Sequence, residues 1–291
     1  MSEDSHKVVA VEGKRYSVGS VIGKGATCTV YSGRNIETDE RVAIREYTYS
    51  PYSKIILTDF RHGIRVHRML NPESDRFPRL YGAEGKVSIA EYVDGWDLGK
   101  FYFQPEDVVL ANAHQISMCL EEFHRSGNGV NIVHMDVKPG NVIARNDGRS
   151  VLIDFDFSWI DDGQPFECIG TPAYLSPEHI NGTKPLPISD IYSLGLTLYK
   201  LYSGMDRLVE SKGLPDNVDD MVFEDEDKII EKIKSSRDVR EVVSTCLRVG
   251  RSYESAEHMR KEIEERLAKF DVRPEQTKDV VAGWLRKRCL N

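Results

Sequence analysis

The sequence predicts an α+β protein with two lobes, a small β-rich lobe followed by a larger helical lobe. Three observations lead to this class. The first 93 residues consist mainly of β-forming stretches separated by glycine turns, with one helical pattern among them. Long helical patterns fill the remainder, and no internal repeat divides the chain. Its 291 residues suffice for one large core or two small ones.

The β-rich lobe begins with two strands joined by a glycine-bearing turn. "YSVGSVIG" and "CTVYSGR" are rich in β-formers, and "GKGAT" separates them. "ERVAIREY" predicts a third strand. "KIILTDFRHGIRVHRML" has apolar residues at helical spacing, and "NPESDRFP" ends that helix. "RLYGAEGKVSIAEYV" predicts two further strands joined by a short turn.

The helical lobe follows. "EDVVLANAHQISMCLEEFHRSG" predicts a long amphipathic helix, and the nearly all-apolar "PISDIYSLGLTLYKLYSG" predicts a helix buried on all sides. Residues 218–285 have helical patterns in several pieces, and the hydrophilic "LPDNVDDMVFEDEDK" predicts a solvated loop and helix start. We expect a cleft between the lobes. The expected domains are an N-terminal extension (1–15), the β-rich lobe (16–93), the helical lobe (94–270) and a C-terminal helical tail (271–291).

Composition excludes several classes of protein. The net charge of −8 argues against a dedicated nucleic-acid binder, which is usually basic. No apolar run approaches the roughly 18 residues of a membrane span, and "MSEDSHKVVAV" lacks a signal-peptide core. The cysteines are scattered and odd in number, which fits a reducing cytoplasmic setting better than a disulfide scaffold or a zinc site. They are Cys28, Cys119, Cys168, Cys246 and Cys289.

Five motifs occur in a fixed order: "GKGATCTV", "VAIRE", "HMDVKPGN", "DFDF" and "SPE". In order and spacing they resemble the eukaryotic-type protein kinase superfamily, with its Gly-rich loop, β3 lysine, H-R-D-x-x-x-x-N, D-F-G and A-P-E. "GTPAYLSPE" and "SDIYSLGLTLYKL" strengthen the resemblance, which covers roughly residues 16–270. It implies the bilobal protein-kinase fold, with ATP as the phosphate donor and a protein as the substrate or regulated partner.

The resemblance also implies roles for the polar motif residues. Asp136 would accept or orient the proton of a substrate hydroxyl, and Lys138 would lie near the transferring phosphate, a pattern typical of serine/threonine substrates. Asn141 and Asp154 would hold Mg²⁺, or Mn²⁺ in its place, because their oxygens suit a hard cation.

A nucleotide pocket is implied in the same way. Gly23 and Gly25 would let the loop backbone approach the phosphates. Adenine would be sandwiched by Val30, Ala43 and Ile143, beside a hinge from Glu91 to Val93 and a small gatekeeper, Ala90. For the aliphatic residues, plain core packing is an equally natural interpretation.

Three departures concern the phosphate site. Arg45 replaces the β3 lysine, and the helix position that should hold its glutamate partner is Gly63. No acidic residue lies between Phe60 and Asn71, so the usual ion pair cannot form; we hypothesise that Gly63 leaves room for the guanidinium. Asp156 replaces the glycine of D-F-G, which adds a charge that either strengthens metal binding or repels phosphate.

Two further departures concern neighbouring loops. Met135 replaces the arginine that anchors a phosphorylated loop, so we predict that phosphorylation of Ser158 or Thr171 is not the switch. Cys28 replaces the third loop glycine, either as a reactive thiol over the nucleotide or as a passive small side chain. Lys24 could replace the missing lysine but would normally point to solvent.

Other residues fit an intact fold. We expect a buried ion pair between Glu178 and Arg251, and we expect Asp190 to tether the catalytic loop. The resemblance implies that His134 and Phe155 would belong to the internal spine of the family. His67 occupies an aliphatic position of that spine, which predicts a loosely held helix or a surface histidine.

Three functions remain open at this point. The departures favour a pseudokinase or strongly impaired serine/threonine kinase that binds ATP and acts on a partner protein. The alternative is an active, atypical serine/threonine kinase that uses Arg45, and a third reading is a scaffold that binds no nucleotide. The C-terminal "DVVAGWLRKRCLN" is either a partner-docking segment or a last helix packed on its lobe. The oligomeric state is left open.

Overall fold

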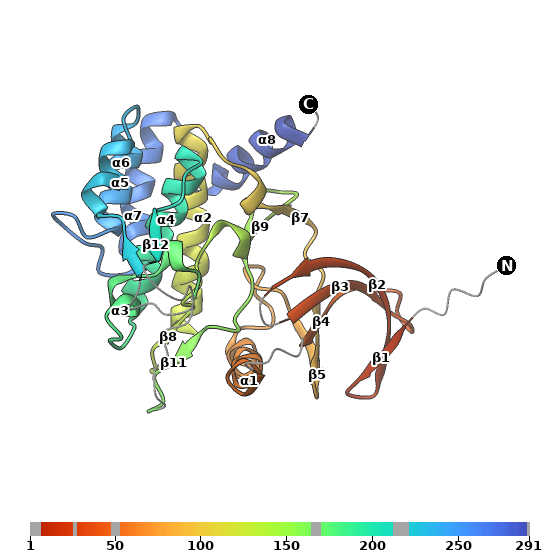
Figure 1. The fold of residues 1–291 in the computed structure, drawn as a ribbon. Helices are drawn as coiled ribbons and strands as arrows, with labels where there is room; N and C mark the ends of the chain where they lie inside the picture. The colour runs from red at the N-terminus through yellow and green to blue at the C-terminus, as the bar shows by residue number, and fades with distance from the viewer. Residues whose placement is uncertain (1–6, 26–27, 48–52, 164–169, 212–220, 290–291) are drawn as a thin grey trace. The chain divides into compact units, whose positions relative to one another are not determined.

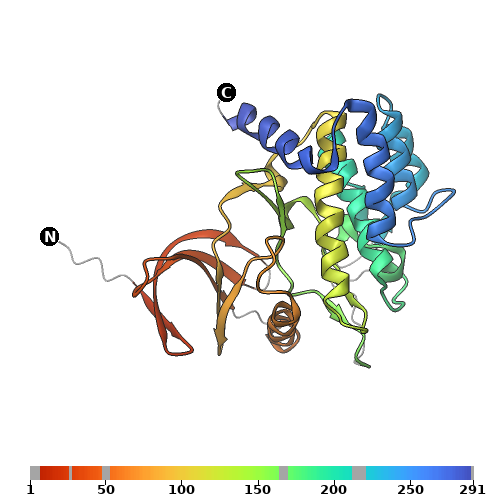
Figure 2. The same ribbon diagram turned by 180° about the vertical axis from the view of Figure 1, so that it is seen from behind.

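The structure is a computed structural model that describes the chain except residues 1–6, 26–27, 48–52, 164–169, 212–220 and 290–291, and the side chains of residues 53–59 and 211. It divides into two compact units (Figures 1 and 2). The N-terminal unit is Met1–Asp94 with Asp154–Asp156, and the C-terminal unit is Gly95–Ile153 with Phe157–Asn291.

One antiparallel sheet of six strands forms most of the N-terminal unit, in the order β1-β2-β3-β4-β6-β5 (Figure 1). Its strands are β1 (Val8–Val11), β2 (Lys14–Lys24), β3 (Cys28–Asn35), β4 (Arg41–Tyr47), β5 (Leu80–Glu84) and β6 (Val87–Glu91). The sheet buries Val11, Tyr16, Val42, Ile44 and Ile89 as one apolar cluster. The first strand thus lies within the segment described above as an extension, and its Val11 belongs to this core.

Helix α1 (Ser53–Met69) is the helix of the N-terminal unit. Phe60 and Ile64, one turn apart, pack with Tyr47 from the end of β4. This spacing is the apolar periodicity from which the helix was predicted. Because Phe60 and Ile64 are both buried in this cluster, α1 holds a fixed face toward the strands.

The C-terminal unit is mainly helical. Its helices are α2 (Glu106–Arg125), α3 (Pro177–Ile180), α4 (Pro187–Ser203), α5 (Glu226–Lys232), α6 (Arg237–Cys246), α7 (Ala256–Leu267) and α8 (Thr277–Cys289). Short strands accompany them: β7 (Gly95–Asp97), β8 (Ile132–Val133), β9 (Val142–Arg145), β10 (Ser150–Leu152), β11 (Trp159–Ile160), β12 (Val209–Ser211) and β13 (Met221–Phe223). The α+β class, with a β-rich unit before a larger helical one, is confirmed.

The prediction that α2 is amphipathic is wrong. Every residue from Val108 to Ser117 is buried, because α2 packs against α4, α7 and α8 (Figure 2). Helix α4 is buried nearly all round, as predicted, and ends at Gly204, whose φ of 72° favours glycine. Within the acidic stretch before α5, residues 214–220 lie outside the described residues, and β13 follows them.

The C-terminal helix α8 packs within its own unit. Thr277, its first residue, accepts a hydrogen bond from Gln115 Nε2 of α2 at 2.7 Å. The Trp284 ring lies 6.3 Å from that of Phe101, edge to face. Over the described part of the chain, no helix combines the length and the apolar character needed to cross a bilayer.

Candidate active site

The predicted catalytic loop of the C-terminal unit runs between β8 and β9. Asp190, fully buried near the start of α4, accepts hydrogen bonds from the backbone N–H groups of His134 (2.8 Å) and Met135 (2.9 Å). Met135 has a φ of 67°, a left-handed conformation that these two hydrogen bonds to Asp190 hold in place. Burial alone would raise the pKa of Asp190, but its hydrogen bond with His124 helps to lower it. Asp190 therefore tethers the loop, as expected from the sequence.

Asp136 is held by hydrogen bonds on both of its oxygens. Oδ2 accepts from Lys138 Nζ (2.7 Å) and Asn141 Nδ2 (2.8 Å), and Oδ1 accepts from the backbone N–H of Thr171 (3.0 Å). Lys138 Nζ also donates to Thr171 Oγ1 at 2.6 Å. The structure thus brings Asp136, Lys138 and Asn141 together. Sequence reasoning did not assign Thr171 to this cluster, although "GTPAYLSPE" contains the signal.

The candidate metal ligands present oxygens with fixed orientations. Asn141 Nδ2 donates to both Oδ2 and the main-chain oxygen of Asp136, which turns the amide oxygen Oδ1 to the opposite side. In the N-terminal unit, Asp154 accepts from Arg45 through Oδ1 and leaves Oδ2 available. Oxygen donors of this kind fit Mg²⁺ or Mn²⁺. No cluster of three or more His, Cys, Asp or Glu side chains suited to a metal occurs among the described residues.

Arg45 is paired with two carboxylates inside the N-terminal unit. It lies on β4 between Val30 of β3 and Ser88 of β6. Its Nη2 donates to Asp156 Oδ2 at 2.7 Å and to Asp154 Oδ1 at 2.8 Å. The Asp156 side chain is 1% exposed and that of Asp154 35%. Burial would lower the pKa of Arg45, but the charge of Asp156 helps to raise it well above its usual value. The usual ion pair with a helix glutamate is absent, as predicted from Gly63, but sequence reasoning missed that Asp156 and Asp154 pair with Arg45 instead.

Gly63 does not provide space for the guanidinium, so that hypothesis is also wrong. A Cβ at position 63 would lie 2.7 Å from Asp156 Oδ1 and 2.8 Å from Asp156 Cα. A Cβ atom essentially never lies within 3.0 Å of another residue's heavy atom, so Gly63 leaves room for Asp156 instead. In this turn the left-handed residue is Asp154 (φ 68°), whereas Asp156 does not have a positive φ.

The glycine-bearing turn and its surroundings lie at the ends of β2 and β3. Gly23 stands opposite Val30, and the N–H of Gly25 donates to the oxygen of Cys28 at 2.9 Å. Lys24 is exposed. Cys28 is 4% exposed, and burial raises the pKa of its thiol although Arg45 lowers it. This favours the passive role of Cys28 over the reactive one.

The remaining adenine-site candidates are divided between the units. Ala43 of β4 is paired with Ala90 of β6. The N–H of Glu91 donates to the oxygen of Arg79 at 2.8 Å, and Val93 follows in the irregular segment before β7. Ile143 lies on β9 of the C-terminal unit, between β10 and β7. Their contact with adenine remains a prediction.

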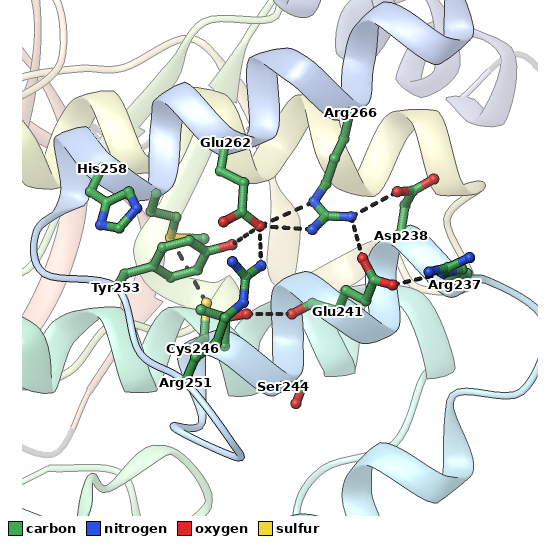
Figure 3. A network of polar contacts seen from close by, with 12 residues as sticks. Arg237, Asp238, Glu241, Ser244, Cys246, Arg251, Tyr253, His258, Glu262 and Arg266 are labelled. Carbon is green, nitrogen blue, oxygen red and sulfur yellow. Dashed lines mark hydrogen bonds and ion pairs between the residues drawn. The ribbon is translucent and has the colours of Figure 1, made fainter.

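The ion pair of Glu178 has a different partner from the expected one. Arg248 Nη1 donates to Glu178 Oε1, and Arg248 Nη2 donates to the oxygen of Ile188 at 3.2 Å. Arg251 instead pairs with Glu262, in a network that also contains Arg266 (Figure 3). Arg248 has φ of 63°, a backbone turn that sequence spacing did not reveal. The assignment of Arg251 is therefore wrong.

His67 is neither loosely held nor on the surface. Its residue is 7% exposed, its Nε2 lies 2.6 Å from the oxygen of Pro78, and its ring centroid is 5.0 Å from that of Phe155. Phe155 also contacts Phe77 at 6.1 Å. His67 thus extends the aromatic core of the N-terminal unit, and both sequence expectations for it are wrong.

The six-stranded sheet with one helix, the tethered loop and the Asp136–Lys138–Asn141 cluster define the class of protein kinases. The chain belongs to this family: the profile described as "Protein kinase domain" matches residues 16–261.

Similar proteins agree with this family. Serine/threonine-protein kinase PknL of Mycobacterium tuberculosis is 31% identical over 202 residues, which cover 65% of this chain and 49% of PknL. Serine/threonine-protein kinase ATG1b of Arabidopsis thaliana is 30% identical over 196 residues, covering 65% of this chain and 28% of ATG1b. The chain thus spans about half or less of these relatives. The BubR1 kinase domain matches with a TM-score of 0.66 at 20% identity, covering 96% of this chain and 86% of that one, and this likeness concerns the fold alone.

Proposed function

We propose that this chain is an atypical serine/threonine protein kinase that transfers phosphate from ATP to a protein hydroxyl. The hydrogen-bonded cluster of Asp136, Lys138 and Thr171 carries the proposal. A carboxylate that merely capped a turn would not need a lysine and a backbone N–H on its two oxygens. The similarity to serine/threonine kinases at about 30% identity supports the substrate class.

The protein groups would act as follows. Asp136 orients the substrate hydroxyl and accepts its proton, since its oxygens are fixed by their donors. Lys138 neutralises negative charge that develops on the transferred group. Asn141 and Asp154 would hold Mg²⁺ or Mn²⁺, whose chemistry is to neutralise phosphate charge.

Gly23 and Gly25 would let backbone N–H groups approach the phosphates. Val30, Ala43, Ile143 and the hinge from Glu91 to Val93 would bind adenine.

One observation favours a second function, the pseudokinase. Arg45 Nη2 bonds to Asp154 as well as to Asp156, so a candidate metal ligand is partly neutralised by a protein cation. If that bond persists with nucleotide present, metal binding is weakened and the chain would act through a partner protein.

Nucleotide binding and transfer are tested separately. In a thermal-shift experiment, ATP with Mg²⁺ or Mn²⁺ at about 100 times its Kd should add about 2.7 kcal/mol of stability. Radiolabelled ATP with generic protein substrates then measures transfer, with Asp136→Asn as the matched control.

The outcomes separate three functions. A shift with transfer that Asp136→Asn abolishes supports the kinase. A shift without transfer indicates the pseudokinase, and no shift with any nucleotide or metal indicates the nucleotide-free scaffold.

A further inference from the structure

Within the N-terminal unit, the acidic partner of Arg45 is in a different place from the one that the family pattern predicts. The pattern puts a glutamate on the helix, at the position of Gly63. Here the partner is Asp156, two residues after Asp154, and it is almost fully buried. The site keeps the same charge balance, one cation and two carboxylates, although one carboxylate has moved from the helix to the turn.

Gly63 and Asp156 depend on each other. A side chain at 63 would overlap the Cα and the carboxylate of Asp156, so a helix glutamate and Asp156 cannot both be accommodated. A buried carboxylate is stable only when it is paired, and Arg45 Nη2 at 2.7 Å supplies that pairing. The substitutions at 45, 63 and 156 are thus parts of one arrangement.

The arrangement also gives a reason for arginine rather than lysine at position 45. Within the described residues, the hydrogen bonds of Arg45 all leave from Nη2: to Asp154, to Asp156 and, weakly, to Cys28 Sγ at 3.6 Å. Nε and Nη1 keep N–H donors that can each reach a separate phosphate oxygen. Lysine would have to serve Asp154, Asp156 and phosphate from the three N–H groups of one nitrogen, whereas arginine has further donors on Nε and Nη1.

We propose that Asp156 is a positioning residue that holds Arg45 through Nη2, and that the remaining N–H groups of Arg45, on Nε and Nη1, bind nucleotide phosphate. The first part stands on the geometry of the N-terminal unit. The second part rests on the function proposed above. One consequence is that, among the described side chains of α1, none is a charge partner of Arg45, and α1 contacts the 154–156 turn through Gly63 and through His67, whose ring centroid lies 5.0 Å from that of Phe155.

The ion pair is tested by a double-mutant cycle on the full chain. Arg45→Met, Asp156→Asn and the double variant are unfolded in urea without nucleotide. We expect the unfolding equilibrium constants to deviate from additivity by about tenfold or more, because each single change leaves a buried charge unpaired. The control cycle is Lys7→Met with Glu46→Gln, an exposed pair at 2.7 Å in the same unit, which should deviate at most a few-fold. An additive Arg45–Asp156 cycle would overturn the first part.

A second measurement covers the case in which Arg45→Met fails to fold. Gly63→Ala is compared in the wild-type chain and in an Asp156→Gly background by urea unfolding. Since Asp156→Gly releases the turn from Arg45 and removes the carboxylate that a Cβ would meet, the destabilisation by Gly63→Ala should become several-fold smaller there. An equal loss in both backgrounds contradicts the dependence of Gly63 on Asp156.

Phosphate binding is tested with two probes, ATP with Mg²⁺ and adenosine alone. Arg45→Lys should weaken ATP binding about tenfold and change adenosine binding less than about twofold. The triple variant Arg45→Lys, Asp156→Gly, Gly63→Glu, which restores the family arrangement, should recover ATP affinity. Equal losses for the two probes would overturn the second part.

The two proposals fail in distinguishable ways. If the Arg45–Asp156 cycle is coupled but the chain neither binds nor uses ATP, the positioning role of Asp156 stands and the proposed kinase function is refuted. If the chain transfers phosphate but the Arg45–Asp156 cycle is additive, the proposed kinase function stands and the positioning role of Asp156 is refuted.

Discussion

At the scale of single residues, burial decides what three side chains can do. His67 has a neutral ring in the folded chain, because burial and the nearby charge of Arg45 lower its pKa from 6.5 to about 4, although its bond to the oxygen of Pro78 opposes them. Cys28 remains a thiol for a similar reason, since burial raises its pKa. The buried carboxylate of Asp156 is stabilised by its ion pair with Arg45, which offsets the cost of removing the charge from water. The residue type alone reveals none of these states.

His67 should make stability depend on pH in a defined window. Its folded pKa lies below its unfolded value, so its contribution is complete above about pH 6.5 and is lost as the pH falls toward 4. The loss is about 1.4 kcal/mol per pH unit within that window. Urea midpoints at pH 7.5 and 5.5 should therefore differ more for the wild type than for His67→Leu. His67→Gln, which keeps a donor for Pro78, is the control, and an unchanged pH difference in both variants would contradict this assignment.

Cys28 should react slowly with alkylating reagents. Cys28 is 4% exposed and its raised pKa leaves little thiolate, whereas Cys289 is exposed. Iodoacetamide at pH 8, followed by peptide mass mapping, should label Cys28 at least about tenfold more slowly than Cys289. Comparable rates would restore the reactive thiol as the better interpretation.

At the scale of elements, backbone turns decide which charges meet. Glu178 at the start of α3 pairs with Arg248 because the chain turns at Arg248, with φ of 63°, directly after α6. Burial alone would raise the pKa of Glu178, but hydrogen bonds from Arg248 and Ser176 outweigh it and lower the pKa to about 2.

Arg248→Ala should destabilise the C-terminal unit by about 2–4 kcal/mol, since it leaves Glu178 half-buried and without its cation. Arg251→Ala is the matched control: its pair with Glu262 has an arginine that is 56% exposed, so its loss should be below about 1 kcal/mol. Thermal unfolding of both variants at pH 7 checks the order. A larger loss for Arg251→Ala would reinstate the assignment made from sequence.

Helix α8 is docked through a glycine. A Cβ at Gly148 would lie 1.7 Å from the oxygen of Lys278 and 2.9 Å from the N of Ala282. Gly148→Ala should therefore displace α8 and cost about 2 kcal/mol or more, which includes left-handed strain. Gly129→Ala isolates that strain, because Gly129 also has a positive φ but an open surrounding, and should cost about 1 kcal/mol. Limited proteolysis near residue 277 should accelerate only in Gly148→Ala, and equal cleavage would contradict the docking.

The elements could be predicted from sequence because their signals are local. Apolar alternation and glycine turns gave the sheet of the N-terminal unit, and the apolar run of 187–203 gave α4. The amphipathic pattern assigned to α2 failed because its polar residues are also buried, as Asn112 shows through its bond to Gln104 Oε1 at 2.8 Å. Burial on several sides depends on neighbours that a local pattern does not contain.

At the scale of the whole molecule, the motifs predicted the family and the Asp136 cluster but missed two pairings. Position 63 has no carboxylate, so the ion pair of Arg45 looked absent. The partner is 111 residues away along the chain, and a spacing rule derived from the usual glutamate cannot find it. The prediction of the partner of Glu178 failed for the same physical reason, since the spacing pattern indicated Arg251 and the fold brings Arg248 into contact. Ordered motifs fix which segments are present, whereas a charge finds whichever partner the fold brings within reach.

The same geometry predicts that activity does not depend on phosphorylation of the loop between Asp154 and Glu178. Met135, in place of the anchoring arginine, is buried against Val133 and Trp159. Thr171 is held by Lys138 and Asp136 without any phosphate. Because Thr171 is already fixed by these contacts, a phosphate gains little there, and no arginine at 135 is available to bind one.

Phosphatase-treated and kinase-treated protein should therefore have ATP affinity and phosphate transfer within about twofold of each other. Thr171→Val is the control, because removing its hydroxyl should lower transfer in both preparations by loosening Lys138. Mass spectrometry must establish the state of Ser158 and Thr171 in each sample. A large gain that requires a phosphate on either residue would show that the loop is switched by a cation other than residue 135.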